Sequence, residues 1–266
     1  EFLNHQYDSD SKVLIELFQK FKLRSLNFLN GMFAFAIYDR TKKKIYLIKD
    51  RFGIKPLYYY KDEKKFIFSS EIKAIKLALN NTLKLDNISV SNYISLNHTC
   101  GTRTIYKNIH SLQPGHYLTF EVTTQKLSVK KWYSPKQTKT TLKKFSDYVS
   151  LAENQLKKSI SLWSTSDVPI SFLLSGGLDS GLLSAIYSET MHEKINTISL
   201  GFKKKSEANW NELDVVDDFV NHSKTNHRSI FFKPDCLADN LDEIINFLDE
   251  PFGGGLPKWF VFKKIS

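Results

Sequence analysis

The segment VPISFLLSGGLDSGLL, from Val168 to Leu183, sets the interpretation of the whole chain. Its apolar and β-branched first half predicts a buried strand, and the apolar residues after the glycines recur at the spacing of a helix. A strand would therefore run into a tight glycine loop that opens a helix. Such a loop aims backbone N–H groups and the positive helix end at one place, which is what a phosphate needs.

An acidic residue in this loop narrows the choice of ligand. The loop is not a Walker A motif, because no Gly-Lys-Ser/Thr follows, and it lacks the GxGxxG spacing of dinucleotide-binding folds. Asp179 stands where a phosphate is expected, and a carboxylate there makes sense if a divalent metal lies between the two. The alternative is an ordinary strand-to-helix turn in which a serine or Asp179 caps the helix.

Composition limits the class of protein. The 266 residues fit one or two domains, and a hydrophobic content of 41% is too high for a disordered chain. Cys100 and Cys236 lie far apart and match no metal spacing, which suits a reducing cytoplasm. No apolar run approaches the ~20 residues of a membrane span. We therefore expect a cytoplasmic protein without a membrane partner.

The net charge of +10 comes from the first half of the chain. A basic half can indicate binding to nucleic acid. Here the lysines lie in turns between expected strands, at 41–44 and 62–65, and the chain has no basic helix and no aromatic–basic RNA motif. A solvated lysine-rich surface is the better interpretation, and no nucleic-acid partner is expected.

The pattern of expected elements changes near residue 145. Before it, short apolar strands follow one another closely, with helices around them, which predicts an antiparallel α+β layer domain. The expected strands are 29–39, 45–48, 57–60, 66–69, 116–122 and 127–132, and the expected helices are 13–21, 72–79 and 89–96. Residues 134–144 are polar and read as a linker.

After residue 145, strands and helices alternate, which predicts βαβ units and a parallel sheet with its ligand at the strand ends. The expected strands are 168–174, 195–202 and 228–232, and the expected helices are 145–163, 181–190, 212–220 and 237–248. We therefore divide the chain into a domain at 1–133, a linker at 134–144 and a domain at 145–266.

Four motifs carry a resemblance to a known family. GMFAFA at 31–36, DRFGIKPLY at 50–58 and SEIKA at 70–74 resemble the class II glutamine amidotransferase domain. SGGLDS at 175–180 resembles the pyrophosphate loop of the ATP pyrophosphatases. In this order, the motifs resemble the glutamine-hydrolysing asparagine synthetases from about residue 8 to the end of the chain.

The resemblance implies a fold and a reaction. The first domain would be a four-layer αββα fold of the N-terminal-nucleophile type, and the second an α/β domain with a parallel, doubly wound sheet. In that family, the first domain frees ammonia from glutamine and a tunnel carries it to the second. There ATP activates the aspartate side chain as an acyl-adenylate, and ammonia displaces AMP. The implied partners are glutamine, aspartate, ATP and Mg²⁺, with a homodimer as one assembly and the oligomeric state left open.

The resemblance also implies roles for individual residues. The ATP-binding candidates are Leu173, Ser175, Gly176, Gly177, Leu178, Asp179, Ser180, Leu200 and Gly201, with Asp179 at Mg²⁺ and the pyrophosphate. Asp10 matches a site for the amino group of glutamine, and Glu212, Asp249 and Glu250 are substrate-side candidates.

Each of these acids has an alternative explanation. Asp10 and Glu212 are also natural helix caps. The alternative for Asp249 and Glu250 is a polar helix end that Pro251 breaks. Lys12 stands where the family has Glu after the aspartate that Asp10 matches, which weakens that match.

Two departures from the family affect activity. The glutaminase nucleophile of this family is an N-terminal Cys whose own α-amine acts as the base, and residue 1 here is Glu. The glutamine-binding Arg and Asn-Gly segments and a second glycine–acid loop also have no match. We expect an internal fragment of a protein roughly twice this length, inactive by itself, with Met-Cys about 80 to 90 residues upstream.

Two other functions remain open at this point. The same two domains could amidate another carboxylate, such as a sugar acid or a β-lactam precursor. They could also form a non-catalytic ATP-binding subunit.

Overall fold

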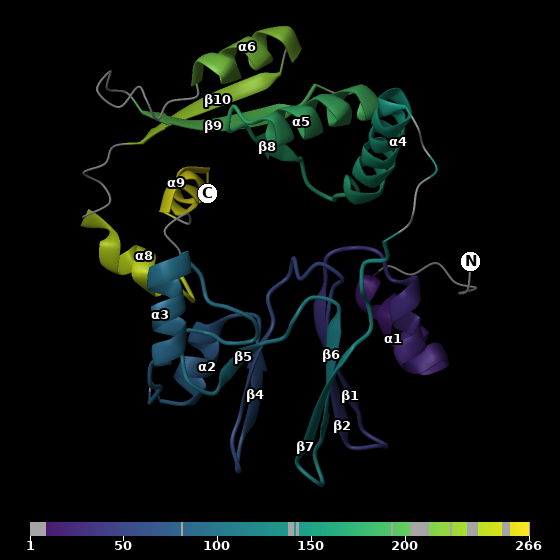
Figure 1. Ribbon diagram of the computed structural model, residues 1–266, viewed down its shortest axis with the longest axis vertical. Coiled ribbons are helices and arrows are strands. Elements are labelled where there is room, and N and C mark those ends of the chain that lie inside the picture. Colours follow the sequence, from purple (N-terminus) through teal and green to yellow (C-terminus); the bar gives the residue numbers. More distant parts are fainter. Residues whose placement is uncertain are drawn as a thin grey trace. The chain divides into compact units, whose positions relative to one another are not determined.

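The computed structural model describes residues 9–80, 82–137, 141, 144–192, 194–202, 213–223, 225–232, 239–251 and 256–265 (Figure 1). Contacts divide the chain into two units. The first unit is Glu1–Gln137 with Asp249–Pro251, and the second is Thr138–Leu248 with Phe252–Ser266.

Two antiparallel sheets form the centre of the first unit. One has the order β1-β2-β6-β7, and these strands are Ala34–Asp39, Lys44–Lys49, His116–Glu121 and Lys126–Lys131. The other has the order β4-β3-β5, which are Phe66–Ser69, Tyr58–Lys61 and Ile109–Ser111. The helices are α1 (Asp10–Phe21), the 3-10 helix η1 (Lys22–Phe28), α2 (Ile72–Ala78) and α3 (Asn87–Leu96).

The apolar faces of these sheets explain their packing. A core that includes Leu47, Leu57, Leu118 and Phe120 joins the two sheets, and the Phe120 ring stacks on Phe66 with centroids 4.1 Å apart. Further clusters pack α1 against the first sheet and α2 against the second. Burial of such side chains stabilises the fold by about 1.5–3 kcal/mol each. The complete four-layer arrangement and the N-terminal-nucleophile type stay predictions.

The expectation for strand 29–39 is wrong in one respect. We expected a strand buried on both faces, but β1 covers only Ala34–Asp39, and its side chains are partly to fully exposed. The reason is its position in the sheet: β1 is an edge strand that pairs with β2 alone. Strand β5 was not expected, because three residues are too few to show a period of two.

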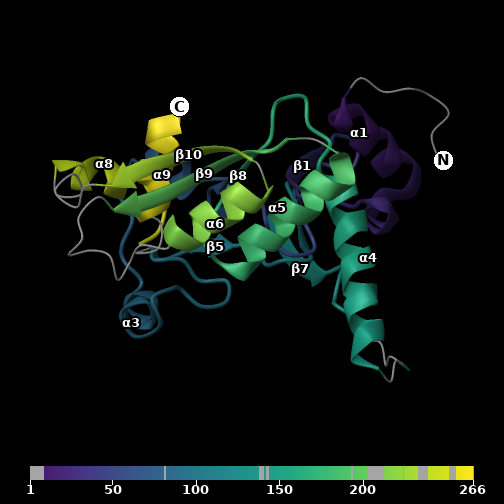
Figure 2. The same ribbon diagram turned by 90° about the horizontal axis from the view of Figure 1, so that it is seen from above.

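The second unit contains a three-stranded parallel sheet of order β10-β9-β8, with strands Asn226–Phe232, Asn196–Phe202 and Ser171–Leu173 (Figure 2). Its helices are α4 (Phe145–Trp163), α5 (Leu178–Met191), α6 (Leu213–Ser223), α8 (Leu241–Phe247) and α9 (Leu256–Ile265). Helix α5 begins at Leu178, directly after the glycines, rather than at residue 181. The doubly wound arrangement stays a prediction.

Both α8 and α9 pack on this sheet. Ile198 and Ile230 of the strands lie in one cluster with Ile244 of α8 and Trp259 of α9. Along a strand, alternate side chains point to opposite faces, so the neighbours of Ile198 must point away from this cluster. Among the described residues, no helix is both long and apolar enough to cross a membrane.

A polar network lies on strands β9 and β10 and on Thr225, the residue before β10. Thr197 Oγ1 is hydrogen-bonded to Thr225 Oγ1 at 3.0 Å and to His227 Nδ1 at 2.9 Å, and His227 Nε2 is hydrogen-bonded to Ser229 Oγ at 3.1 Å. Burial lowers the pKa of His227, and the negative charge of Asp217 opposes this change. Burial therefore favours the neutral form of the ring.

This network predicts a loss of stability in mild acid. Because the pKa of His227 is lower in the folded than in the unfolded state, the unfolded chain binds the proton first as the pH drops. The contribution of neutral His227 to stability is therefore fully present above the usual histidine pKa of about 6.5. It falls as the pH drops through the window between that value and the lowered folded value. The melting temperature of a His227→Gln variant should lack this contribution over the same window. A pH dependence equal to that of the wild type would contradict the prediction.

Candidate functional site

The glycine loop is anchored at the end of β8. Leu174 is buried, its backbone N–H donates to the Ile198 carbonyl at 2.8 Å, and its own carbonyl accepts a 2.8 Å hydrogen bond from Ser199 Oγ. The chain direction is therefore fixed by β9 immediately before the loop begins.

Two serines close the loop on itself. Ser180 Oγ accepts from the Ser175 backbone N–H at 3.3 Å, is hydrogen-bonded to Ser175 Oγ at 3.1 Å and donates to the Gly177 carbonyl at 3.1 Å. Gly176 has a φ of +76°, which L-residues with a side chain rarely adopt. Gly177 is the N-cap of α5 and has no side chain that could accept from the first turn. The first N–H groups of α5 thus have no side-chain cap, which suits an anionic ligand.

Asp179 lies in the first turn of α5 and is exposed. In the part of the chain that the structure describes, its carboxylate takes part in no hydrogen bond or ion pair, so Asp179 does not cap the helix. No serine caps the helix either, because the N-cap residue is Gly177. An exposed carboxylate beside uncapped N–H groups can hold a divalent cation against a bound phosphate. The residues present therefore fit Mg²⁺.

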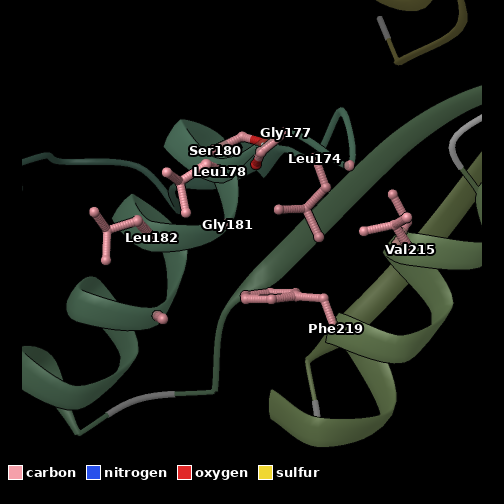
Figure 3. Close-up of a pocket in the computed structure, with 11 residues that line it drawn as sticks. Leu174, Gly177, Leu178, Ser180, Gly181, Leu182, Val215 and Phe219 are labelled. Atoms are coloured by element: carbon pink, nitrogen blue, oxygen red, sulfur yellow. The ribbon is translucent and has the colours of Figure 1, made fainter.

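An apolar pocket of about 500 Å³ adjoins the loop (Figure 3). One wall comes from Leu174, the glycines and α5, and the other from Val215, Val216 and Phe219 of α6. Its size and apolar lining suit the flat ring of a nucleobase. The α6 residues were missed as site candidates, because helical periodicity indicates a buried face and says nothing of a ligand.

The end of β9 extends past the end of β8. Ser171 pairs with Asn196 and Leu173 with Ile198, so continuing this register would bring Ser175 beside Leu200. The Leu200 side chain packs on the core formed with α8 and α9, which leaves its backbone as the group that can face a ligand. Gly201 is buried, and Leu173 is 42% exposed.

The remaining candidates lie in the first unit or outside the described residues. Asp10 is exposed in the first turn of α1, and the cap of that helix is Ser9, whose Oγ accepts from the Ser11 N–H at 3.2 Å. The capping explanation for Asp10 is therefore wrong. Glu212 lies outside the described residues. Asp249 and Glu250 belong to the first unit.

Comparison with known proteins covers both units. The model of the glutamine amidotransferase domain matches residues 2–133, and the asparagine synthase model matches residues 151–266. A putative glutamine-hydrolysing asparagine synthetase 2 of Methanocaldococcus jannaschii is 33% identical over 97% of this chain and 50% of its own length. Asparagine synthetase 1 of Bacillus subtilis is 28% identical over 97% of this chain and 40% of its own.

The chain belongs to the family of glutamine-hydrolysing asparagine synthetases. It spans about half the length of the curated relatives it matches. A relative of another name, the amidase chyE of Penicillium rubens, is 26% identical over 70% of this chain and 27% of its own. A solved glutamine phosphoribosylpyrophosphate amidotransferase of B. subtilis matches 77% of this chain and 42% of its own at 16% identity, with a TM-score of 0.34.

Proposed function

We propose that the intact protein amidates aspartate to asparagine with ammonia from glutamine, at the expense of Mg·ATP. The observation that carries this proposal is the loop of the second unit. An acid without a partner among the described residues, uncapped helix N–H groups and an apolar pocket of about 500 Å³ lie together there. The matches to both family domains support the same reaction. We propose the cytoplasm as its compartment.

Residues of this chain would act as follows. The N–H groups at the start of α5, with the hydroxyls of Ser175 and Ser180, bind the phosphates once the hydroxyls exchange their mutual hydrogen bonds for the ligand. The pocket beside α6 holds the base. The backbone at Leu200 and Gly201, which is not part of the pocket lining, is proposed to contact the nucleotide. Asp179 holds Mg²⁺, which when bound neutralises charge on the departing pyrophosphate.

The chemistry then needs two displacements. A carboxylate is a poor electrophile, so an oxygen of the aspartate side chain first attacks the α-phosphorus and pyrophosphate leaves. Ammonia next attacks the acyl carbon of the resulting aspartyl-adenylate, and AMP leaves with the shared oxygen. Asp10 is proposed to bind the glutamine amino group in the first unit, and Glu212 remains a substrate-side proposal.

The test measures pyrophosphate release from Mg·ATP by the intact protein, with ammonia as the nitrogen donor. Release should depend on aspartate, and asparagine should appear in equal amount. If release depends on another carboxylic acid instead, that acid and not aspartate is the acceptor. The amidase chyE shows that relatives of this chain are not all named for asparagine, so a panel of carboxylic acids belongs in the same experiment. Nucleotide binding without release for any acceptor would indicate the non-catalytic subunit.

A further inference from the structure

A small polar pocket lies in the first unit, away from the glycine loop. Its volume is about 170 Å³, below the roughly 300 Å³ at which pockets for drug-sized ligands begin, so it suits a small metabolite. The charged and titratable residues of its lining are Asp86, Arg103 and His110. The whole lining falls between residues 86 and 110, and the pocket therefore belongs to the first unit alone.

Backbone pairing places Arg103 beside His110. The two residues form an isolated antiparallel bridge, and His110 of β5 also pairs with Tyr59 of β3. Residues directly opposite each other in such a pair have Cβ atoms about 4.5–5.5 Å apart on the same face. The His110 ring packs on Tyr59 with the ring centroids 5.4 Å apart. The guanidinium and the imidazole therefore lie next to each other on one face.

Asp86 adds a negative charge next to Arg103. Asp86 Oδ2 accepts from Arg103 Nη1 at 2.9 Å, and Oδ1 accepts from the Ser89 backbone N–H at 3.0 Å as the N-cap of α3. The hydrogen bond from Ser89 is the main reason that the pKa of Asp86 is lowered, so this carboxylate is ionised. The pocket thus holds one positive and one negative group in fixed neighbouring positions.

These groups have hydrogen-bonding capacity left. Among the described residues, the Arg103 side chain makes only its hydrogen bond to Asp86, although a guanidinium has five N–H donors. The ring nitrogens of His110 make none within the same residues. Burial and then the charge of Arg103 lower the pKa of His110, while Asp86 opposes this change. The neutral ring is therefore favoured, and one of its nitrogens can accept a hydrogen bond.

We propose that this pocket binds the head group of a small α-amino acid. The ligand carboxylate takes free N–H donors of Arg103, in the two-bond geometry that a guanidinium offers. The ligand ammonium donates to Asp86 and to the acceptor nitrogen of His110. The positive charge of Arg103 disfavours a metal ion and the negative charge of Asp86 disfavours a simple anion, whereas a zwitterion matches both. This site is independent of the amidation reaction proposed above.

The rest of the lining favours a short polar side chain on the ligand. Thr102 and Asn108 are exposed residues of the lining, so they border the opening of the pocket to solvent. Thr104 is buried, and its hydroxyl already donates to the carbonyls of Tyr106 and Ile109, which leaves it no free donor. The side chain of the ligand therefore meets the hydroxyl and amide groups at the opening.

An NMR titration of this 266-residue chain tests the site directly. The probes are glycine, serine, asparagine and aspartate, and the signals are the Arg103 Nε–H and the His110 ring. At least one probe should shift both signals saturably. The N-acetyl derivative and the amide of that amino acid lack one charge each and should bind at least tenfold more weakly. If none of the four probes shifts these signals saturably, or if the blocked derivatives bind equally well, the proposal is overturned.

Two variants locate the bound amino acid. Asp86→Asn keeps the cap on α3, because Asn caps as well as Asp, but loses the charge that meets the ammonium. Arg103→Gln loses the charge that meets the carboxylate, and an exposed ion pair contributes little to stability, so the fold should remain. Each should raise the dissociation constant at least tenfold at an unchanged melting temperature. The matched control is Arg24→Gln, at an exposed arginine of η1 outside the pocket.

His110→Phe provides a third variant that keeps the packing of the core. Phenylalanine retains a ring against Tyr59 but has no nitrogen to accept from the ammonium. Its affinity for the amino acid should fall about threefold or more. Wild-type affinity in either Asp86→Asn or Arg103→Gln would place the amino acid elsewhere on the chain and contradict the site. None of these measurements needs amide formation, so a failure of the proposed function would leave their outcome unchanged.

Discussion

Replacing Asp179 with asparagine is expected to lower aspartate-dependent pyrophosphate release by ~10²-fold or more, about 3 kcal/mol in the activation barrier. The substitution keeps the shape of the side chain but removes the negative charge that would hold Mg²⁺ against the phosphates. Asp179 is exposed and makes no hydrogen bond among the described residues, so the fold should not be affected. The melting temperature without ligand should stay the same.

A second measurement separates binding from turnover. Mg·ATP should raise the melting temperature of the wild-type chain, because a ligand that binds only the folded state stabilises it. In Asp179→Asn the part of this increase that depends on Mg²⁺ should be lost. Asp214→Asn is the matched control, since Asp214 is an exposed acid in the first turn of the neighbouring helix α6. Near-normal turnover of Asp179→Asn would defeat the metal-binding role.

Replacing Asp50 with alanine is expected to destabilise the first unit by about 3 kcal/mol. Asp50 is only 1% exposed, and its carboxylate accepts from the backbone N–H groups of Phe52, Ile54 and Lys55 at 3.0–3.1 Å. Alanine would leave these donors without their acceptor in the turn that follows β2. Each buried donor left unsatisfied costs about 1–3 kcal/mol, and water that enters the turn recovers part of the sum.

The matched control for Asp50 is Asp62→Ala. Asp62 Oδ1 also accepts from two backbone amides, those of Lys64 and Lys65, but in an exposed turn. Water can replace the carboxylate there, so the loss of stability should be much smaller. Denaturant unfolding monitored on the first unit would measure both variants. Equal losses for the two would show that the burial of Asp50 does not determine its contribution.

The pKa of Asp50 also predicts how the stability of the first unit changes in acid. Burial by itself would raise the pKa of Asp50, but the hydrogen bonds from Lys55, Ile54, Phe52 and Gly53 outweigh it and lower the pKa. The unfolded chain therefore takes up this proton first. The contribution of the Asp50 carboxylate to stability is fully present above the usual aspartate pKa of about 3.9. It is lost as the pH falls through the lowered pKa of the folded state. Asp50→Ala should be less sensitive to pH in this acidic window.

The elements that depend on near neighbours were predictable from sequence. Strand β4 at Phe66–Ser69 and helix α4 at Phe145–Trp163 lie at the expected positions. The glycine loop also lies between a strand and a helix, as expected, because a β-branched run and two glycines impose that geometry locally. Hydrophobic periodicity and turn chemistry act over a few residues, so they can be read without knowing the fold.

Contacts between distant residues were decided only by the tertiary structure. The sequence of β1 is apolar enough for a central strand, but the sheet leaves it at an edge. The motif around Asp249 and Glu250 indicates acidic side chains, while their acceptor roles at Lys73 and Ile105 require the folded first unit. Likewise, Phe219 enters the site only because α6 packs beside the glycine loop. The sequence thus determined which groups are available for phosphate chemistry, and the packing of segments far apart in the chain determined which groups meet, since no local preference encodes a contact across more than a hundred residues.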